Sequence, residues 1–176
     1  MSEAWEEIAG DAATELLLIG DHASKRVPAD IDLGIAPELL GLHIAIDLGV
    51  AEVAAALNRR TGMPAILGGV SRLVVDLNRE EDAPHIVPVA SDGHAIPGNA
   101  VSHEARQARI GRFWHPYHDE ISRRIAVDRP RLLVSLHSFT PSLESDPGQA
   151  RPWQIGILYN RDDRAARVAI PALEGA

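Results

Sequence analysis

The stretch Leu132-Leu-Val-Ser-Leu-His-Ser-Phe139 decides the fold of this sequence. It is a short apolar run between Arg-Pro-Arg and Thr-Pro, which is the length and setting of a buried strand. His137 lies near its C-terminal end, and open α/β sheets carry their chemistry at the C-terminal ends of their strands. The stretch therefore predicts a central strand that presents His137 at the functional edge of a sheet.

A second stretch repeats this design far upstream. Residues 15–20 contain the apolar run Leu16 to Ile19, which predicts another buried strand, and a loop with the sequence Asp-His-Ala-Ser follows it at residues 21–24. If the two strands are parallel neighbours, His22 and His137 converge on one edge of the sheet. Metal ligands that are distant in sequence meet in this way.

Strands alternate with helices along the rest of the chain. We expect helices over 37–60 and 102–127 and from about 162, strands over 63–67 and 153–159, and an irregular lead-in or short helix over 1–14. Ser102 is the expected N-cap of the second helix, and residues 80–100, with three prolines, are expected to form an excursion or a mobile loop. The alternation predicts an α/β protein, a three-layer sandwich with a mostly parallel central sheet.

Bulk composition narrows the class of protein. The 176 residues are 45% hydrophobic, which predicts a single domain over residues 1–176. The acidic N-terminus and the lack of a long apolar run predict a cytoplasmic protein with no membrane role. A net charge of -8 argues against a nucleic-acid partner. Because cysteine is absent, any metal must bind to His, Asp or Glu.

Asp47 is an acid without an obvious partner. No Lys or Arg lies three or four positions away on the predicted helix. A metal ion shared with His22 and His137 would supply that partner, and two histidines with one carboxylate form a known catalytic zinc set. The alternative is an exposed helix stripe shared with His43. Spacing favours the metal only modestly, because widely separated ligands leave no local signature.

Residues 71–79 are a second candidate group. Two arginines, Arg72 and Arg79, and the polar residues Asp76 and Asn78 interrupt an apolar segment, and arginine suits the bidentate capture of a carboxylate. The alternative is an internal salt bridge from Asp76 to one of the arginines. Both can hold at once, with one arginine structural and the other facing a substrate.

His115 and His118 share one face of the second long helix and could bind a metal themselves, although Pro116 would kink that helix. We expect His115 to be a packing or surface residue, and we keep His118 as a candidate supporting or oxyanion-stabilising group. The other histidines are expected to be structural or exposed. No Gly-x-Ser-x-Gly elbow surrounds Ser24 or Ser138, and no phosphate-binding loop is present, which disfavours a serine hydrolase or a nucleotide enzyme.

These motifs, in this order, resemble those of the N-formylglutamate amidohydrolase family, and the resemblance covers nearly the whole chain. The matching segments are Asp21-His-Ala-Ser24 with Val27-Pro28, Asp47-Leu-Gly49, Ser71-Arg-Leu-Val-Val-Asp-Leu-Asn-Arg79, Tyr117-His118 and Ser135-Leu-His-Ser-Phe139. The resemblance implies a hydrolase with a zinc exopeptidase-like fold, in which an acid on the first long helix and two histidines hold zinc. By position these ligands are His22, Asp47 and His137.

The resemblance also implies a reaction. Zinc would polarise an amide carbonyl and activate a water, so that an N-formyl or N-acyl amino acid, a small molecule of amino-acid metabolism, is hydrolysed at a non-peptide amide bond. Arg72, Asn78 and Arg79 would bind the substrate carboxylates.

The family pattern continues into a late strand that bears a glutamate, a candidate general base, so we expect this chain to lack the C-terminal portion of the family. Glu144 is the nearest substitute. A carboxylate-binding module without catalysis and a cell-wall peptide amidase remain the alternatives. The sequence leaves the oligomeric state open.

Overall fold

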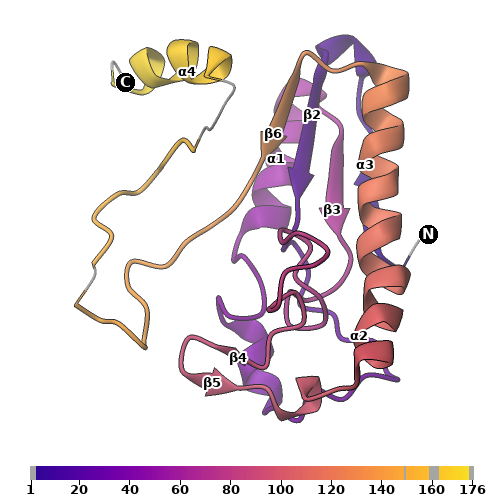
Figure 1. The fold of residues 1–176 in the computed structure, drawn as a ribbon. Coiled ribbons are helices and arrows are strands. Elements are labelled where there is room, and N and C mark those ends of the chain that lie inside the picture. The colour runs from indigo at the N-terminus through magenta and orange to yellow at the C-terminus, as the bar shows by residue number, and fades with distance from the viewer. Residues whose placement is uncertain (1–2, 149, 159–162, 175–176) are drawn as a thin grey trace. The chain divides into compact units, whose positions relative to one another are not determined.

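The computed structural model describes residues 3–148, 150–158 and 163–174. The chain divides into two compact units, Met1–Thr140 and Pro141–Ala176 (Figure 1). The first unit contains the sheet and all of the predicted metal ligands.

The first unit is built on a four-stranded sheet with the order β1-β3-β2-β6. Its strands are β1 (Trp5–Ile8), β2 (Leu16–Gly20), β3 (Ala65–Gly68) and β6 (Leu132–Ser135). Strand β2 is parallel to both of its neighbours, β3 and β6, whereas β1 pairs antiparallel with β3. The expected mixed α/β fold with a mostly parallel sheet is therefore confirmed.

Helices cover both faces of this sheet. Leu17 and Ile66 point into a core formed with the helical segment that precedes β6, whereas Leu18 and Leu67 pack on Val50 and its neighbours in α1 (Val50–Thr61). The opposite alternation of neighbouring strand residues follows from the two-residue period of a strand. Figure 1 shows α1 and the long helix α3 (His115–Asp128) on opposite sides of the strands.

Two predictions about the strands are wrong. The lead-in, expected to be irregular or a short helix, contains strand β1, because its backbone pairs with β3 although two glutamates occupy its centre. The strand that ends near His137 is not central but lies at the edge of the sheet, and it is four residues long. Among the described strands only β2 pairs with it, so Leu132 and Leu133 stay partly exposed.

The predicted helix over 37–60 is also interrupted. A 3-10 turn covers Pro37–Gly41, turns follow, and α1 begins only at Val50. Gly49, with φ +83°, lies immediately before α1 in the left-handed region, which is easily adopted only by glycine. Asp47 consequently lies in a loop before the helix rather than on it.

The second helix prediction is confirmed with one refinement. Ser102 accepts a hydrogen bond from the Ala105 amide and caps α2 (His103–Arg109), a π-helical turn covers Ile110–Trp114, and α3 runs over His115–Asp128. The wider turn ends two residues before Pro116, which has no amide hydrogen to donate.

The predicted excursion contains a short hairpin of β4 (Ala90–Ser91) and β5 (His94–Ala95). The remaining 3-10 turns are Ala12–Thr14 and Pro97–Asn99.

The second unit contains α4 (Arg164–Glu174), close to the helix expected from about residue 162. The strand expected over 153–159 is not formed in its described residues, 153–158, because they pair with no other strand, and Trp153, Ile155 and Leu158 are exposed. Tyr159 lies outside the described residues.

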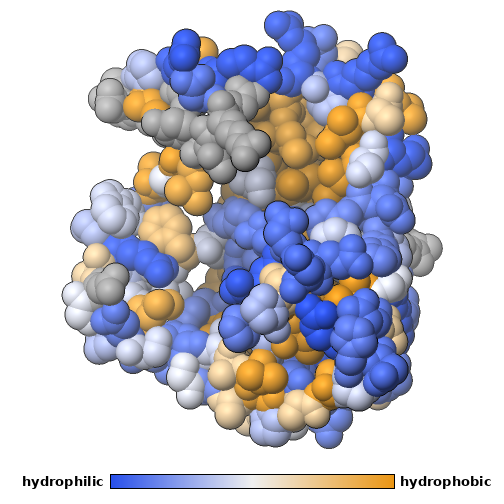
Figure 2. Space-filling model, in the orientation of Figure 1, coloured by the Kyte–Doolittle hydropathy of each residue, from blue (hydrophilic) through white to orange (hydrophobic). Residues whose placement is uncertain are grey.

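Surface chemistry changes along the first unit. In Figure 2 hydrophobic atoms show over the strands, and mostly hydrophilic atoms cover the loops that follow them. None of the helices in the described ranges has the length and apolar character to span a lipid bilayer.

Candidate metal centre

The ends of the two neighbouring parallel strands bring His22 and His137 together. His22 follows β2, His137 follows β6, and the Leu136 amide still donates to the Ile19 carbonyl beyond the last paired residues. The two imidazole rings lie 5.5 Å apart between centroids. The predicted convergence at one edge of the sheet is therefore found in the structure.

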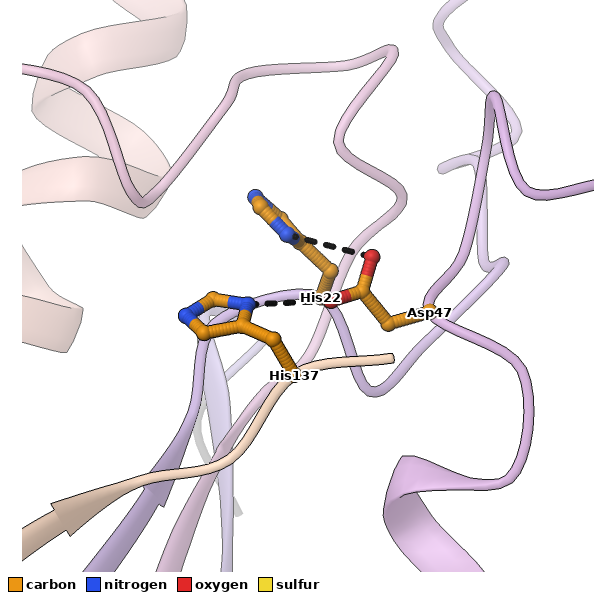
Figure 3. A group of neighbouring side chains, drawn as sticks. All are labelled: His22, Asp47 and His137. Carbon is orange, nitrogen blue, oxygen red and sulfur yellow. Dashed lines mark hydrogen bonds and ion pairs between the residues drawn. The ribbon is translucent and has the colours of Figure 1, made fainter. Parts of the chain in front are cut away.

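Asp47 lies between the two histidines. Its backbone amide donates to the His22 carbonyl, which joins the 42–49 loop to the end of β2. One carboxylate oxygen lies 3.4 Å from Nδ1 of His22, and the other lies 2.9 Å from Nδ1 of His137 (Figure 3). One potential ligand atom from each residue falls within 4.8 Å of the others. Both histidines thus direct the same ring nitrogen, Nδ1, toward one carboxylate.

A close backbone contact fixes the position of the loop that follows β2 and carries Asp21 and His22. A Cβ placed on Gly68, at the end of β3, would lie 2.2 Å from the carbonyl oxygen of Asp21. Only glycine allows the two chain segments to approach this closely. The contact sets the depth of the loop that carries Asp21 and His22.

A metal ion fits these donors. Nδ1 of His22 is buried and has no hydrogen-bond partner among the described residues, although an Asp47 carboxylate oxygen lies 3.4 Å away. Buried polar atoms of this kind require an explanation, and an unrecorded ion is a standard one. Two imidazoles and one carboxylate are the ligand types that zinc binds in catalytic sites.

A further aspartate supports the buried histidine. Nε2 of His22 lies 2.7 Å from the Asp76 carboxylate, and His22 is 1% exposed. Asp76 also pairs with Arg72 at 3.1 Å and with Arg79 at 3.3 Å. Ligand histidines commonly bond a carboxylate through the nitrogen that does not face the metal. Asp76 occupies that position.

Charge pairing shifts the titration of the acidic groups. Burial alone would raise the pKa of Asp47, but the imidazoles of His137 and His22 and the nearby Arg72 outweigh burial and hold it well below its usual range. The same opposition lowers the pKa of Asp76 to about 2, with His22 as the main favourable neighbour. Both carboxylates are therefore ionised near neutral pH, as metal ligation and ion pairing require.

The histidines respond in the opposite direction. Asp21 and then Asp47 raise the pKa of His137 to about 9 in the absence of a metal. Burial lowers the pKa of His22, but Asp47 and Asp76 reverse this effect and leave it raised. Without a metal ion, the cluster is held together by charge attraction.

The arginines predicted to bind substrate are both engaged inside the protein. Arg72 bridges Asp47, at 3.2 Å, and Asp76, while Arg79 donates to Asp76 through Nε. The salt-bridge alternative is thus observed for both arginines. They nevertheless also line a cavity of about 270 Å³ beside Asp76. Arg79 is the more exposed of the two, at 48% against 29%.

The cavity is walled by the hairpin and by apolar residues. Its lining is Ile44, Arg72, Leu73, Asp76, Arg79, His85, Pro88, Ala90 and Ser91. The tip of the hairpin is tied to the loop before Asp47 by a 2.8 Å contact between His43 and Asp92. Donor-bearing groups dominate the polar part of the lining, so the cavity is suited to a ligand with oxygen acceptors.

Asn78 lies between two residues that flank this cavity, Asp76 and Arg79, and His118 contacts the same segment from α3. The backbone amide of Asn78 donates to the Asp76 carboxylate, and the residue itself is exposed. Nε2 of His118 bonds the Leu77 carbonyl, and Nε1 of Trp114 donates to the Arg79 carbonyl. The helix that carries both aromatic side chains therefore holds the segment from which Asn78 and Arg79 project.

Two predicted residues remain, Glu144 and His115. Glu144 belongs to the second unit and bonds within the described structure. His115 pairs with Glu81 at 3.1 Å on the surface, as expected of a surface residue.

Sequence reasoning did not assign a role in the site to Asp21, His85 or Tyr117. Asp21 directly precedes a proposed ligand, and this adjacency was a usable signal. His85 lies in the irregular stretch of residues 80–100, where the sequence carried no signal for a role in the site.

Fold and site together define an α/β protein whose parallel strand ends carry a His–Asp–His group that could hold a metal ion. The chain belongs to the N-formylglutamate amidohydrolase family, whose model matches residues 14–176. The resemblance noted in the sequence motifs is thereby confirmed.

Two solved structures are similar to the chain. The crystal structure of a gene product from Agrobacterium tumefaciens is 34% identical, with a TM-score of 0.87, and the match covers 98% of this chain and 70% of that one. An N-formylglutamate amidohydrolase from Ralstonia eutropha is 23% identical, with a TM-score of 0.58, over 78% of this chain and 57% of that one, and it supports the fold alone. No curated protein matches the chain.

Proposed function

We propose that the chain is a zinc-dependent amidohydrolase that cleaves the amide bond of an N-formyl or N-acyl amino acid, with N-formylglutamate as the family substrate to test first. The observation that carries the proposal is the convergence of His22, Asp47 and His137, with an unsatisfied Nδ1 on His22. These three residues would hold the metal. Membership of the family supports the reaction class.

The bound metal would supply the reactive water and polarise the amide carbonyl, since zinc lowers the pKa of a bound water to about 7. The residues of the chain fix the geometry around it. Asp76 holds His22, and Arg72 ties Asp76 to Asp47, so the buried half of the site is assembled before substrate enters. Preorganisation of this kind avoids reordering during the reaction.

The 270 Å³ cavity beside Asp76 would receive the carboxylate-bearing part of the substrate. Arg79 is the better candidate to bind a carboxylate, because it is more exposed and contacts Asp76 through Nε. Arg72 would act mainly as the internal link. Asn78 projects from the same segment and would add an amide donor, and His85 also lines the cavity.

His118 and Glu144 complete the proposal as the oxyanion-stabilising group and the general base. The bond from His118 to the Leu77 carbonyl supports a role next to the Asn78–Arg79 segment. Glu144 is proposed from its sequence position, seven residues after His137. With these roles, the proposed enzyme is a cytoplasmic, zinc exopeptidase-like three-layer hydrolase of amino-acid metabolism.

Elemental analysis of the purified chain tests the metal. We expect close to one zinc per chain, lost in both His22→Ala and His137→Ala and kept in His103→Ala, whose histidine is exposed and outside the cluster. Release of formate from N-formyl amino acids then tests the reaction. Metal binding without any hydrolysis would leave the carboxylate-binding alternative, and no metal after zinc addition would remove the proposed ligand set.

A further inference from the structure

The second nitrogen of His137 has two possible partners. Its Nδ1 faces Asp47, while Nε2 lies 3.1 Å from the Ser135 hydroxyl and 3.4 Å from a carboxylate oxygen of Asp21. A neutral imidazole that offers Nδ1 to a metal must carry its proton on Nε2. The partner of Nε2 therefore decides whether the ring is held in the orientation that the site needs.

Asp21 is the more fixed of the two partners. The residue is 4% exposed, whereas Ser135 is exposed and its hydroxyl can rotate. In the described part of the chain, neither Lys nor Arg forms an ion pair with Asp21. A buried carboxylate of this kind is stabilised only by its hydrogen bonds and by charged neighbours.

Tyr117 also donates a hydrogen bond to Asp21. Its phenol donates to the other carboxylate oxygen over 2.6 Å, and its side chain is fully buried in α3. Burial, followed by the charge of Asp21, strongly raises the pKa of Tyr117, so the hydroxyl keeps its proton. Asp21 is thus bound at one oxygen by a permanent donor and faces His137 with the other.

The arrangement repeats what is seen at the other histidine. His22 and His137 both direct Nδ1 at Asp47 and place a separate aspartate behind Nε2. The supports differ in kind, because two arginines hold Asp76 and a phenol holds Asp21. The same geometry reached from two different elements indicates a common requirement, the orientation of each ring.

We propose that Tyr117 and Asp21 are positioning residues that hold the ring of His137 through Nε2, so that Nδ1 is presented to the group formed with His22 and Asp47. The proposal rests on the proposed metal centre for its functional meaning. The hydrogen-bond chain itself, from the phenol through the carboxylate to the imidazole, can be tested without a metal.

Zinc affinity, measured by competition with a chromophoric chelator, is the first readout. Tyr117→Phe keeps the ring and removes only the donor, and Asp21→Asn keeps the shape and removes the charge. Loss of an outer partner of a ligand histidine typically weakens metal binding about 10–100-fold, and we expect a loss of this size in both variants.

A control separates positioning from general damage. Asn99→Ala removes a buried amide that bonds the Leu73 and Pro88 carbonyls, away from His137. We expect it to lower the melting temperature while zinc Kd stays within about twofold. If Tyr117→Phe behaves in the same way, with a lower melting temperature and an unchanged Kd, then Tyr117 is only structural and the proposal is overturned.

Imidazole NMR of the metal-free protein makes the test independent of zinc. We expect a slowly exchanging Nε2 proton on His137 in the unmodified chain, lost or strongly shifted in Tyr117→Phe and kept in Ser135→Ala. If this proton signal is lost in Ser135→Ala alone, then Ser135 rather than Asp21 holds Nε2 of His137, and the proposal is overturned. If this pattern is found but zinc does not bind, the positioning chain stands and the metal-centre proposal fails.

Discussion

The two histidines of the site are held by different parts of the fold. His22 is 1% exposed, follows a strand that is paired on both sides, and touches Asp76, which two arginines hold. The His137 side chain is 31% exposed and follows the edge strand β6. One half of the site is therefore part of the core, and the other half is attached to it. We expect the two halves to share a function and to differ in what they contribute to stability.

The sharpest way to test this comparison is to remove each histidine. In the metal-free protein, His22→Ala leaves two buried carboxylates without one of their partners, and breaking a buried pair costs about 3–5 kcal/mol. His137→Ala also takes a partner from two buried carboxylates, Asp47 and Asp21, but the imidazole is 31% exposed and water can replace it, so we expect a smaller loss of about 1–3 kcal/mol. Urea unfolding with a chelator present measures both values. Equal losses would contradict the division into a core half and an attached half.

The strands themselves give the next largest contrast. Leu17 in β2 is 2% exposed, so Leu17→Ala should destabilise the first unit by roughly 2–5 kcal/mol. Leu133, its direct neighbour in β6, is 41% exposed, and Leu133→Ala should cost less than about 1 kcal/mol. Thermal unfolding of the two variants tests the difference. A large effect at Leu133 would show that β6 is covered in solution.

The smallest expected contrast lies between the arginines. Arg72→Ala removes bonds to two buried carboxylates and should cost about 1.5–3 kcal/mol, whereas Arg79→Ala removes one contact of a half-exposed side chain and should cost about 1 kcal/mol or less. For binding we expect the reverse order, with KM for an N-formyl dicarboxylate raised roughly tenfold or more by Arg79→Ala. Equal effects on KM would contradict the assignment of Arg72 as the internal link. Arg79→Lys keeps the positive charge but loses the paired N–H donors of the guanidinium group, so it should recover only part of the binding.

The sequence predicted the site better than the elements that carry it. Apolar runs ending in a histidine predicted that His22 and His137 meet if their strands are parallel neighbours, and β2 and β6 are such neighbours. Asp47 was singled out by its missing partner, and the structure places it between both imidazoles. The prediction that Asp47 lies on a helix was nevertheless wrong. The apolar residues of 42–49 have helical spacing, but the left-handed backbone of Gly49 separates them from α1, which begins at Val50.

Other features could not be found because tertiary pairing decides them. Strand β1 has two glutamates at its centre and forms through backbone bonds to β3, which no apolar pattern records. The edge position of β6 depends on which segments pair with it, a property of the whole sheet. Tyr117 and Asp21 are 96 positions apart, and their bond follows from the packing of α3 on the sheet rather than from spacing.

The contact at Gly68 has a consequence for how the sequence of this protein can change. The distance between the end of β3 and the loop before His22 is set by backbone atoms, with no side chain between them. Volume-conserving exchanges among the aliphatic residues of the core therefore leave this spacing unchanged, because their side chains do not set it. A single methyl group at residue 68 would change it. Tolerance to mutation is thus distributed unevenly: the layers beside the sheet accept exchanges that conserve volume, whereas residue 68 accepts only glycine.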